Sequence, residues 1–291
     1  MKNPLMIEME SSLYPEYLKV PEADLGKGTS VSVAVVKGMD EIAANMAAEM
    51  MAVVDEALAQ GRSATMIIPV GPVDQFSVLA EIINREKRDW RQVVLINMDE
   101  YLSEDEQWIP ADHPLSFRGY MNRKFYDLID PDLAPLAKNR VFPDPADLAG
   151  IQDLIELRGG LDACFGGIGI NGHMAFNEPP EPGEVCSVEE FAARPTRNLN
   201  LSRETITINS VTVGGGLSVI PRRAITVGMK EILGAKKLRF YCNRLWQSAV
   251  VRRVLHDSVS AACPASLMQD HPDAKLTVAE YVAALPDIGL R

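Results

Sequence analysis

The sequence lacks a basic excess, paired cysteines and any long apolar run. Its 291 residues include 29 basic and 40 acidic side chains, which give a formal net charge of -11. A surface that binds nucleic-acid phosphates normally carries a basic excess, so the composition argues against a nucleic-acid-binding protein. No stretch approaches the roughly 20 apolar residues of a membrane span, and the amino terminus has no apolar segment typical of a signal peptide. We therefore expect a cytoplasmic protein that binds neither nucleic acid nor membrane.

The four cysteines, Cys164, Cys186, Cys242 and Cys263, are scattered and form no CxxC pair. This pattern favours reduced thiols over a disulfide framework. Hydrophobic residues make up 47% of the chain and charged residues 24%, so the chain can bury a substantial core. We expect a folded, globular protein.

Short apolar runs alternate with helical patterns along the chain. Residues 39–61 carry apolar side chains at helical spacing and end at Gly61. Apolar runs without polar alternation are typical of parallel strands buried on both faces. The sequence therefore predicts an α/β fold with three layers, in which helices cover both faces of a mostly parallel, doubly wound sheet. The runs predicted as strands are 65–70, 93–98, 163–170, 224–229 and 238–242.

The first part of the chain differs in composition from the rest. It is rich in Pro, Glu and Ser, and the regular pattern begins only at Gly38. We therefore predict that residues 1–37 form an extension packed on a single domain of residues 38–291.

Ligands of such folds bind outside the carboxyl ends of the strands, so we inspected the residues that follow each run. Asp99 and Glu100 follow the second run. Partial burial readily raises the pKa of such carboxylates, which makes them candidates for a general base. The alternative is a strand-end aspartate that caps the next turn.

The third run leads into a glycine-rich segment, residues 166–179, that contains His173 and Glu178. Glycines such as Gly169 and Gly172 let the backbone approach a ligand closely, and histidine titrates near neutral pH. A metal site is disfavoured because His173 and Glu178 are five residues apart and no third ligand is evident. The segment also lacks the full dinucleotide signature, in which GxGxxG is followed by a matching acidic residue, so we expect neither metal nor cofactor. A carboxylate pair and a His/Glu pair suit proton transfer on a sugar, such as an aldose-to-ketose isomerisation.

Five segments of the chain match a known family in the same order. They are NMDEY at 97–101, HPLSFRGYMNRKF at 113–125, GGIGINGHMAFNEP at 166–179, TRNLNLSRETITINS at 196–210 and ITVGMKEIL at 225–233. Together they resemble the glucosamine-6-phosphate deaminase/isomerase family, which shares its fold with 6-phosphogluconolactonases, and five co-linear matches rarely arise by chance. The lactonase branch usually has an Asp-Gly-His-Thr-Ala type sequence after its glycine loop and lacks FNEP, so the chain is more similar to the deaminases.

The resemblance implies a role for each matching residue. Asp99 corresponds to the base that moves a proton between C2 and C1, His173 to the ring-opening catalyst, and Glu178 to the carboxylate that orients it. The implied reaction converts a 2-amino aldose phosphate into a ketose phosphate and ammonia without a metal or organic cofactor. Residues 183–215 resemble the family's mobile lid. Members of the family are monomers, trimers or hexamers, so a homo-oligomer is among the expected states.

The chain departs from the family at four positions. Asn171, a further catalytic candidate, stands where the family has an aspartate; its amide can still hydrogen-bond His173 or a hydroxyl, but it cannot take up a proton. In the phosphate loop, residues 69–74, the family's hydroxyls are missing, Pro72 removes an amide donor and Asp74 adds negative charge at a helix start. Val211 and Gln247 replace the family's phosphate-binding arginine and lysine.

These departures leave open how the far end of the substrate is recognised. Residues 197–253 contain eleven basic and two acidic side chains, which indicates either solvated helix faces or a local anion site. Either this segment supplies substitutes, with Arg223 a further candidate, or the substrate lacks a phosphate. The predicted substrate-binding residues are Gly71, Glu100, Gly169, Gly172, Arg203, Arg222 and Arg244.

Two other functions fit the same motifs. A lactone hydrolase of the 6-phosphogluconolactonase type would use His173 to activate water. A non-catalytic sugar sensor would keep the pocket without the chemistry, but it would have no need for Asp99, His173 and Glu178 together.

Overall fold

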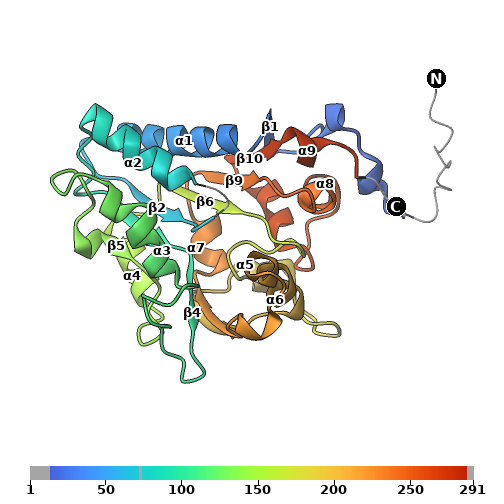
Figure 1. Ribbon diagram of the computed structural model, residues 1–291. Helices are drawn as coiled ribbons and strands as arrows, with labels where there is room; N and C mark the ends of the chain where they lie inside the picture. Colours follow the sequence, from blue (N-terminus) through green and yellow to red (C-terminus); the bar gives the residue numbers. More distant parts are fainter. Residues whose placement is uncertain (1–13, 72–73, 287–291) are drawn as a thin grey trace.

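The computed structural model describes residues 14–71 and 74–286. Its centre is a seven-stranded sheet in the order β1-β10-β9-β6-β2-β3-β5, and every neighbouring pair is parallel (Figure 1). The strands are β1 (Ser32–Val36), β2 (Thr65–Ile68), β3 (Val94–Asn97), β5 (Arg140–Val141), β6 (Ala163–Gly167), β9 (Leu238–Cys242) and β10 (Ala274–Ala279).

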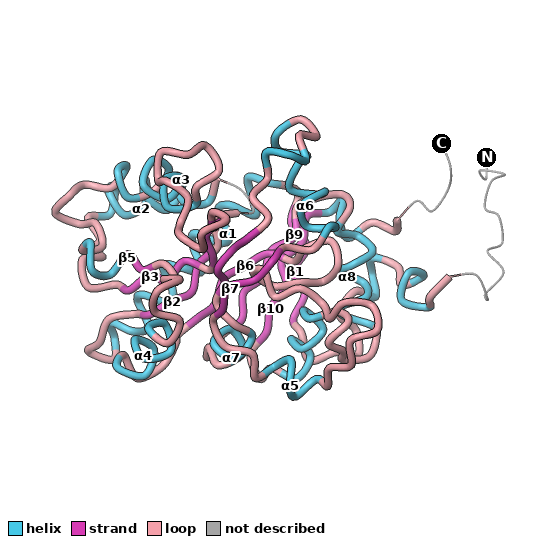
Figure 2. Tube along the Cα trace, turned by 90° about the horizontal axis from the view of Figure 1, so that it is seen from below, coloured by secondary structure: helices cyan, strands magenta, loops and turns pink. Residues whose placement is uncertain are grey.

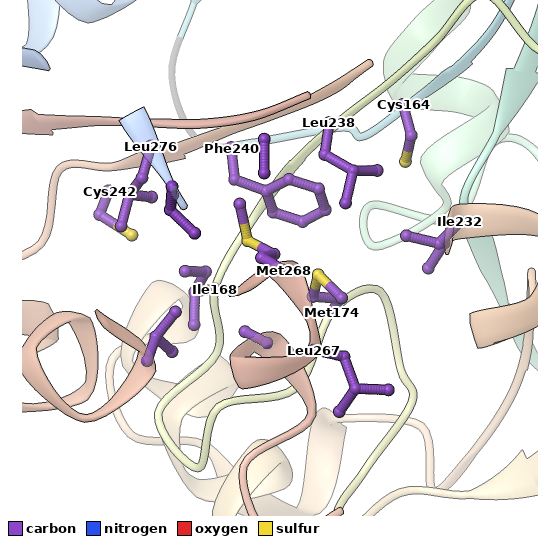
Figure 3. Close-up of a cluster of buried hydrophobic side chains, with 14 of the residues drawn as sticks. Cys164, Ile168, Met174, Ile232, Leu238, Phe240, Cys242, Leu267, Met268 and Leu276 are labelled. Carbon is purple, nitrogen blue, oxygen red and sulfur yellow. The ribbon is translucent and has the colours of Figure 1, made fainter. Parts of the chain in front are cut away.

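Helices cover both faces of this sheet, which confirms the predicted three-layer α/β fold. On β2, Met66 and Ile68 pack into one apolar cluster with helix residues such as Met46, whereas Ile67 joins the cluster on the opposite face. Figure 3 shows this second cluster, where side chains of β9 and β10 meet Met268. One face is covered by α1 (Met39–Ala59), α2 (Gln75–Glu86) and α3 (Phe117–Lys124), and the other by α4 (Gly150–Leu157), α7 (Met229–Leu233), α8 (Gln247–His256) and α9 (Glu280–Ala283).

A second, three-stranded sheet lies beside the central sheet, with the order β4-β8-β7. It contains β4 (Asp99–Leu102), β7 (Arg197–Asn200) and β8 (Arg223–Thr226), and Figures 1 and 2 place it on the side of α5 (Val188–Ala192) and α6 (Arg203–Ser210). Met98 joins the two sheets, because its N–H bonds to the carbonyl of Ile68 and its carbonyl accepts from Val227. The prediction that 224–229 forms a parallel strand is wrong, since β8 pairs antiparallel with both neighbours.

The amino-terminal segment contributes to the sheet. β1 pairs with β10 along its whole length, so the first strand lies within the segment that the sequence assigned to an extension. Before it, the carbonyl of Val20 accepts a hydrogen bond from Arg252, and the amide of Gly26 donates to His256. The start of that predicted extension, residues 1–13, lies outside the described residues. Within the described part of the chain, no helix has the length and apolar character needed to cross a membrane.

Candidate active site

A cavity of about 490 Å³ lies at the carboxyl ends of β2, β3, β6 and β9. The strand order reverses between β2 and β6, and ligands of doubly wound sheets bind at such a switch point. Residues of the phosphate loop, the carboxylate pair and the glycine-rich segment meet at this cavity, although these segments lie far apart along the chain. The cavity wall includes Val70, Gly71, Asp99, Tyr101, Tyr120, Gly169, His173, Asn209, Thr212, Asn243, Arg244, Trp246 and Gln247.

Asp99 begins β4 directly after the chain leaves the central sheet, and its side chain lines the cavity. The residue is 8% exposed, and its carboxyl group makes no hydrogen bond to another described residue. Burial and, to a smaller extent, the negative charge of Glu100 raise the pKa of Asp99 from 3.8 to about 8. A carboxyl group with this pKa exchanges its proton near neutral pH, which suits a general base.

Glu100 faces away from the cavity, contrary to the prediction that it binds substrate. Successive residues of a strand point to opposite sides, and Glu100 is completely buried. One carboxylate oxygen accepts from the amides of Tyr101 and Phe117 at 2.9 and 3.1 Å, and the other from Ser116 and Arg118. Glu100 therefore anchors the amino-terminal end of α3.

Replacing Glu100 by Ala should lower the free energy of unfolding by about 3–5 kcal/mol, because Arg118 and the first amides of α3 lose a buried partner. Urea unfolding measures this change. The matched control is Glu104→Gln, on an exposed turn of the same region. Unchanged stability of the variant together with a raised KM would instead support the predicted role of Glu100 in substrate binding.

His173 lies at the centre of a hydrogen-bonded group. Its Nδ1 is 2.7 Å from Oδ1 of Asn171, 3.3 Å from Oε2 of Glu178 and 3.3 Å from Oγ1 of Thr205. The Nδ2 of Asn171 donates to Glu178 at 2.8 Å, so Oδ1 is the atom that faces the ring. Because amide and carboxylate oxygens accept, Nδ1 carries a proton, and Nε2 of the neutral ring keeps its lone pair for a ligand.

Glu178 is a charged carboxylate at neutral pH. Burial opposes its ionisation, but hydrogen bonds and charge from His173, with further hydrogen bonds from Asn171 and Thr205, outweigh burial and lower its pKa to about 2. This negative charge stabilises a protonated His173. Asn171 therefore keeps an orienting role at the position where the family has an aspartate, while the charge resides on Glu178.

The predicted glycines serve different purposes. Gly169 lines the cavity, and a Cβ there would lie 2.1 Å from Nε2 of His173, so only glycine lets the ring occupy its place. Gly172 has a φ of +89° and packs against Cys263, away from the cavity wall, contrary to its predicted contact with substrate. Gly71 does line the cavity. Its neighbours Pro72 and Val73 lie outside the described residues.

The four candidate arginines lie in different places in the structure. Arg203 and Arg222 line a different cavity, formed around α6, that shares no residue with the first, so the structure does not bring them to the wall that holds Asp99 and His173. Arg203 also lines a third cavity together with Asn171. Arg223 forms an ion pair with Glu106. Arg244, in the loop between β9 and α8, lines the main cavity.

The sequence interpretation missed Thr205 and Asn209. They are four residues apart on α6, so they share one face of that helix, and Asn209 also donates to the hydroxyl of Tyr101 at 3.0 Å. Their helical spacing is readable from the sequence, but the direction of that face is not. Gln247, at the family's lysine position, is buried and donates to the carbonyl of Ile168 at 2.7 Å. Among the described residues, no group of three or more His, Cys, Asp or Glu side chains could hold a metal ion.

Comparison with known proteins connects this geometry to a family. Over 216 residues the chain is 30% identical to a glucosamine-6-phosphate deaminase of Halothermothrix orenii, covering 74% of this chain and 83% of that protein. Over 220 residues it is 33% identical to a glucosamine-6-phosphate deaminase of Clostridium perfringens, with the same coverage. The chain belongs to the glucosamine-6-phosphate deaminase family. This confirms the resemblance of the five segments.

Solved structures agree with this glucosamine-6-phosphate deaminase fold. A monomeric glucosamine-6-phosphate deaminase superposes with a TM-score of 0.75 at 22% identity, covering 88% of this chain and all of that one. A 6-phosphogluconolactonase from Trypanosoma cruzi gives 0.63 at 13% identity, covering 87% and 96%. No family model matches the chain.

The segment that resembles the lid of the glucosamine-6-phosphate deaminases contains α5, β7 and α6. It supplies Asn209 and Thr212 to the cavity wall and Thr205 to His173. This segment therefore completes the site, and its movement stays a prediction.

Proposed function

We propose that the protein converts a 2-amino-2-deoxyaldose phosphate, with glucosamine 6-phosphate as the reference substrate, into the ketose phosphate and ammonia. The observation that carries this proposal is that Asp99 and His173 line one cavity, where Asp99 has a pKa raised to about 8 and the Nδ1 of His173 is held by Asn171. Such a pair matches the two proton transfers that the reaction needs at different atoms. We further propose that the protein acts in the cytoplasm, as a monomer or a homo-oligomer.

His173 would open the sugar ring. Its Nε2 removes the proton of the C1 hydroxyl and delivers it to the ring oxygen, so the C1–O5 bond breaks and an aldehyde forms at C1. While the imidazole ring of His173 carries this proton, the charge of Glu178 and the oxygen of Asn171 stabilise the protonated imidazole. The hydroxyl of Thr205 lies beside the same nitrogen, Nδ1.

Asp99 would then carry out the isomerisation. Its carboxylate removes the proton at C2, and the electron pair forms a C1–C2 double bond while the C1 oxygen takes a proton from water. Return of the proton from Asp99 to C1 leaves a protonated imine at C2, and the hydroxide left by that water takes the extra proton to give the neutral imine. A further water hydrolyses the imine, which yields the C2 ketone and ammonia.

Ammonia release from glucosamine 6-phosphate, measured with the purified protein, tests this function. Galactosamine 6-phosphate, glucosamine and 6-phosphogluconolactone complete the panel. We expect ammonia in step with ketose from at least one hexosamine phosphate, and no faster hydrolysis of the lactone than its spontaneous rate. Lactone turnover without ammonia would instead support a 6-phosphogluconolactonase, and no turnover of the whole panel would contradict an enzyme of this class.

A further inference from the structure

Seven of the eleven cationic side chains in the basic segment at 197–253 are engaged by other residues of the protein. Five of its eleven cationic side chains form ion pairs, Arg252 is buried against backbone carbonyls, and Arg197 donates to Asn177. Of the remaining four, Arg244 lines the main cavity, whereas Arg203, Arg222 and Lys230 do not. The five ion pairs are Arg223–Glu106, Lys236–Asp162, Lys237–Glu56, Arg239–Asp273 and Arg253–Asp257.

Arg244 stands where the main cavity meets a second one. This second cavity, of about 530 Å³, shares four wall residues with the first, and Asp99 and His173 are not among them. A sugar whose reacting carbons lie against Asp99 and His173 therefore extends its other end toward the junction. The shared residues are Val70, Gly71, Tyr120 and Arg244.

The helix starts at this junction do not favour an anion. Asp74 precedes α2 and Asp40 lies in the first turn of α1, and both carboxylates line the second cavity. Their charge opposes the positive end of each helix dipole, which would otherwise attract an anion. Arg244 is thus the single cationic side chain in the wall of either cavity, as far as the described residues define them.

The backbone of Arg244 is fixed by a hydrogen bond, and its side chain is free to bind a ligand in the cavity. Its backbone amide donates to Oε1 of Gln247 at 2.7 Å, and Gln247 in turn donates to the carbonyl of Ile168 at the end of β6. The guanidinium group is exposed to the cavity and forms no ion pair within the described part of the chain. A guanidinium group donates two parallel hydrogen bonds to a phosphate, a geometry that lysine cannot reproduce.

We propose that Arg244 recognises the phosphate of the substrate, so that the anion site has moved from loop 69–74 to the β9–α8 loop. Gln247, at the position of the family's lysine, positions the backbone of Arg244 instead of contacting the phosphate. Asp74 weakens anion binding beside it. This inference rests on the proposed deaminase function.

Steady-state kinetics with glucosamine 6-phosphate and glucosamine test this assignment in Arg244→Gln and Arg244→Lys. We expect Arg244→Gln to raise KM for the phosphorylated sugar about 10- to 100-fold, the usual worth of a hydrogen bond to a charged group, with a smaller change in kcat. KM for glucosamine should stay the same, and Arg244→Lys should recover part of the loss. Asp74→Asn should lower KM for the phosphorylated sugar. The control is Arg85→Gln, on the exposed side of α2.

The outcomes separate this inference from the function it rests on. If the wild-type protein releases no ammonia from any hexosamine, the deaminase function itself is wrong. If it releases ammonia but Arg244→Gln leaves KM for the phosphorylated sugar unchanged, the deaminase function stands and the role of Arg244 is wrong. Equal KM values for the two sugars in the wild-type protein would also overturn it, because no group would then recognise the phosphate.

Discussion

Replacing Asp99 by Asn should reduce kcat for ammonia release by about 10²- to 10⁴-fold, the usual contribution of a positioned general base. The amide keeps the shape of the side chain but cannot accept the C2 proton. Ammonia release under saturating substrate measures the loss. Asp105→Asn, on the exposed turn after β4, is the matched control and should retain wild-type activity.

The pH dependence gives Asp99 a second signature. Because its pKa is raised to about 8 and the base must be ionised, kcat/KM of the wild-type protein should rise with pH through about 8. The folded state holds this proton more tightly than the unfolded state, so ionisation of Asp99 lowers stability as pH rises from about 4 to 8. Asp99→Asn should therefore be at least as stable as wild type above pH 8. An active Asp99→Asn variant with the same pH profile would show that Asp99 is not the base.

Replacing His173 by Gln should lower kcat by a similar factor of about 10²–10⁴, since His173 is the group that carries the proton from the C1 hydroxyl to the ring oxygen. Glutamine can still hydrogen-bond Asn171 and Glu178, but it cannot relay a proton. The same ammonia assay measures the loss. Exchange of the C2 hydrogen with deuterated water should disappear as well, because Asp99 acts only on the open chain.

Two glutamate variants test whether the charge of Glu178 contributes to the reaction. Glu178→Gln should reduce kcat less than His173→Gln, because it removes the charge that stabilises protonated His173 while leaving the ring in place. Glu181→Gln, exposed and three residues away, should have no effect. If Glu178→Gln matched wild type, charge on Glu178 would have no part in the reaction.

The fold shows where sequence patterns are informative. The runs 65–70 and 163–170 contain the parallel strands β2 and β6, as predicted, because both faces of each strand are buried and the pattern therefore lacks polar residues. The run at 224–229 is similarly apolar, but residues 224–226 belong to β8 of the antiparallel sheet. Local composition reports burial, whereas pairing direction depends on which strand lies alongside.

The candidate site also has a part that the sequence predicts and a part that depends on the tertiary structure. By itself, the sequence determined the short-range part: Asn171, His173 and Glu178 lie within eight residues, so one glycine-rich turn brings them together. Only the tertiary structure decided the rest. Asp99 and His173 line one cavity because the sheet order reverses between β2 and β6, and Arg244 lines it because it follows β9, whose carboxyl end borders the cavity. Residue types and local spacing are encoded along the chain, but the charge that remains at a cavity depends on contacts between distant segments.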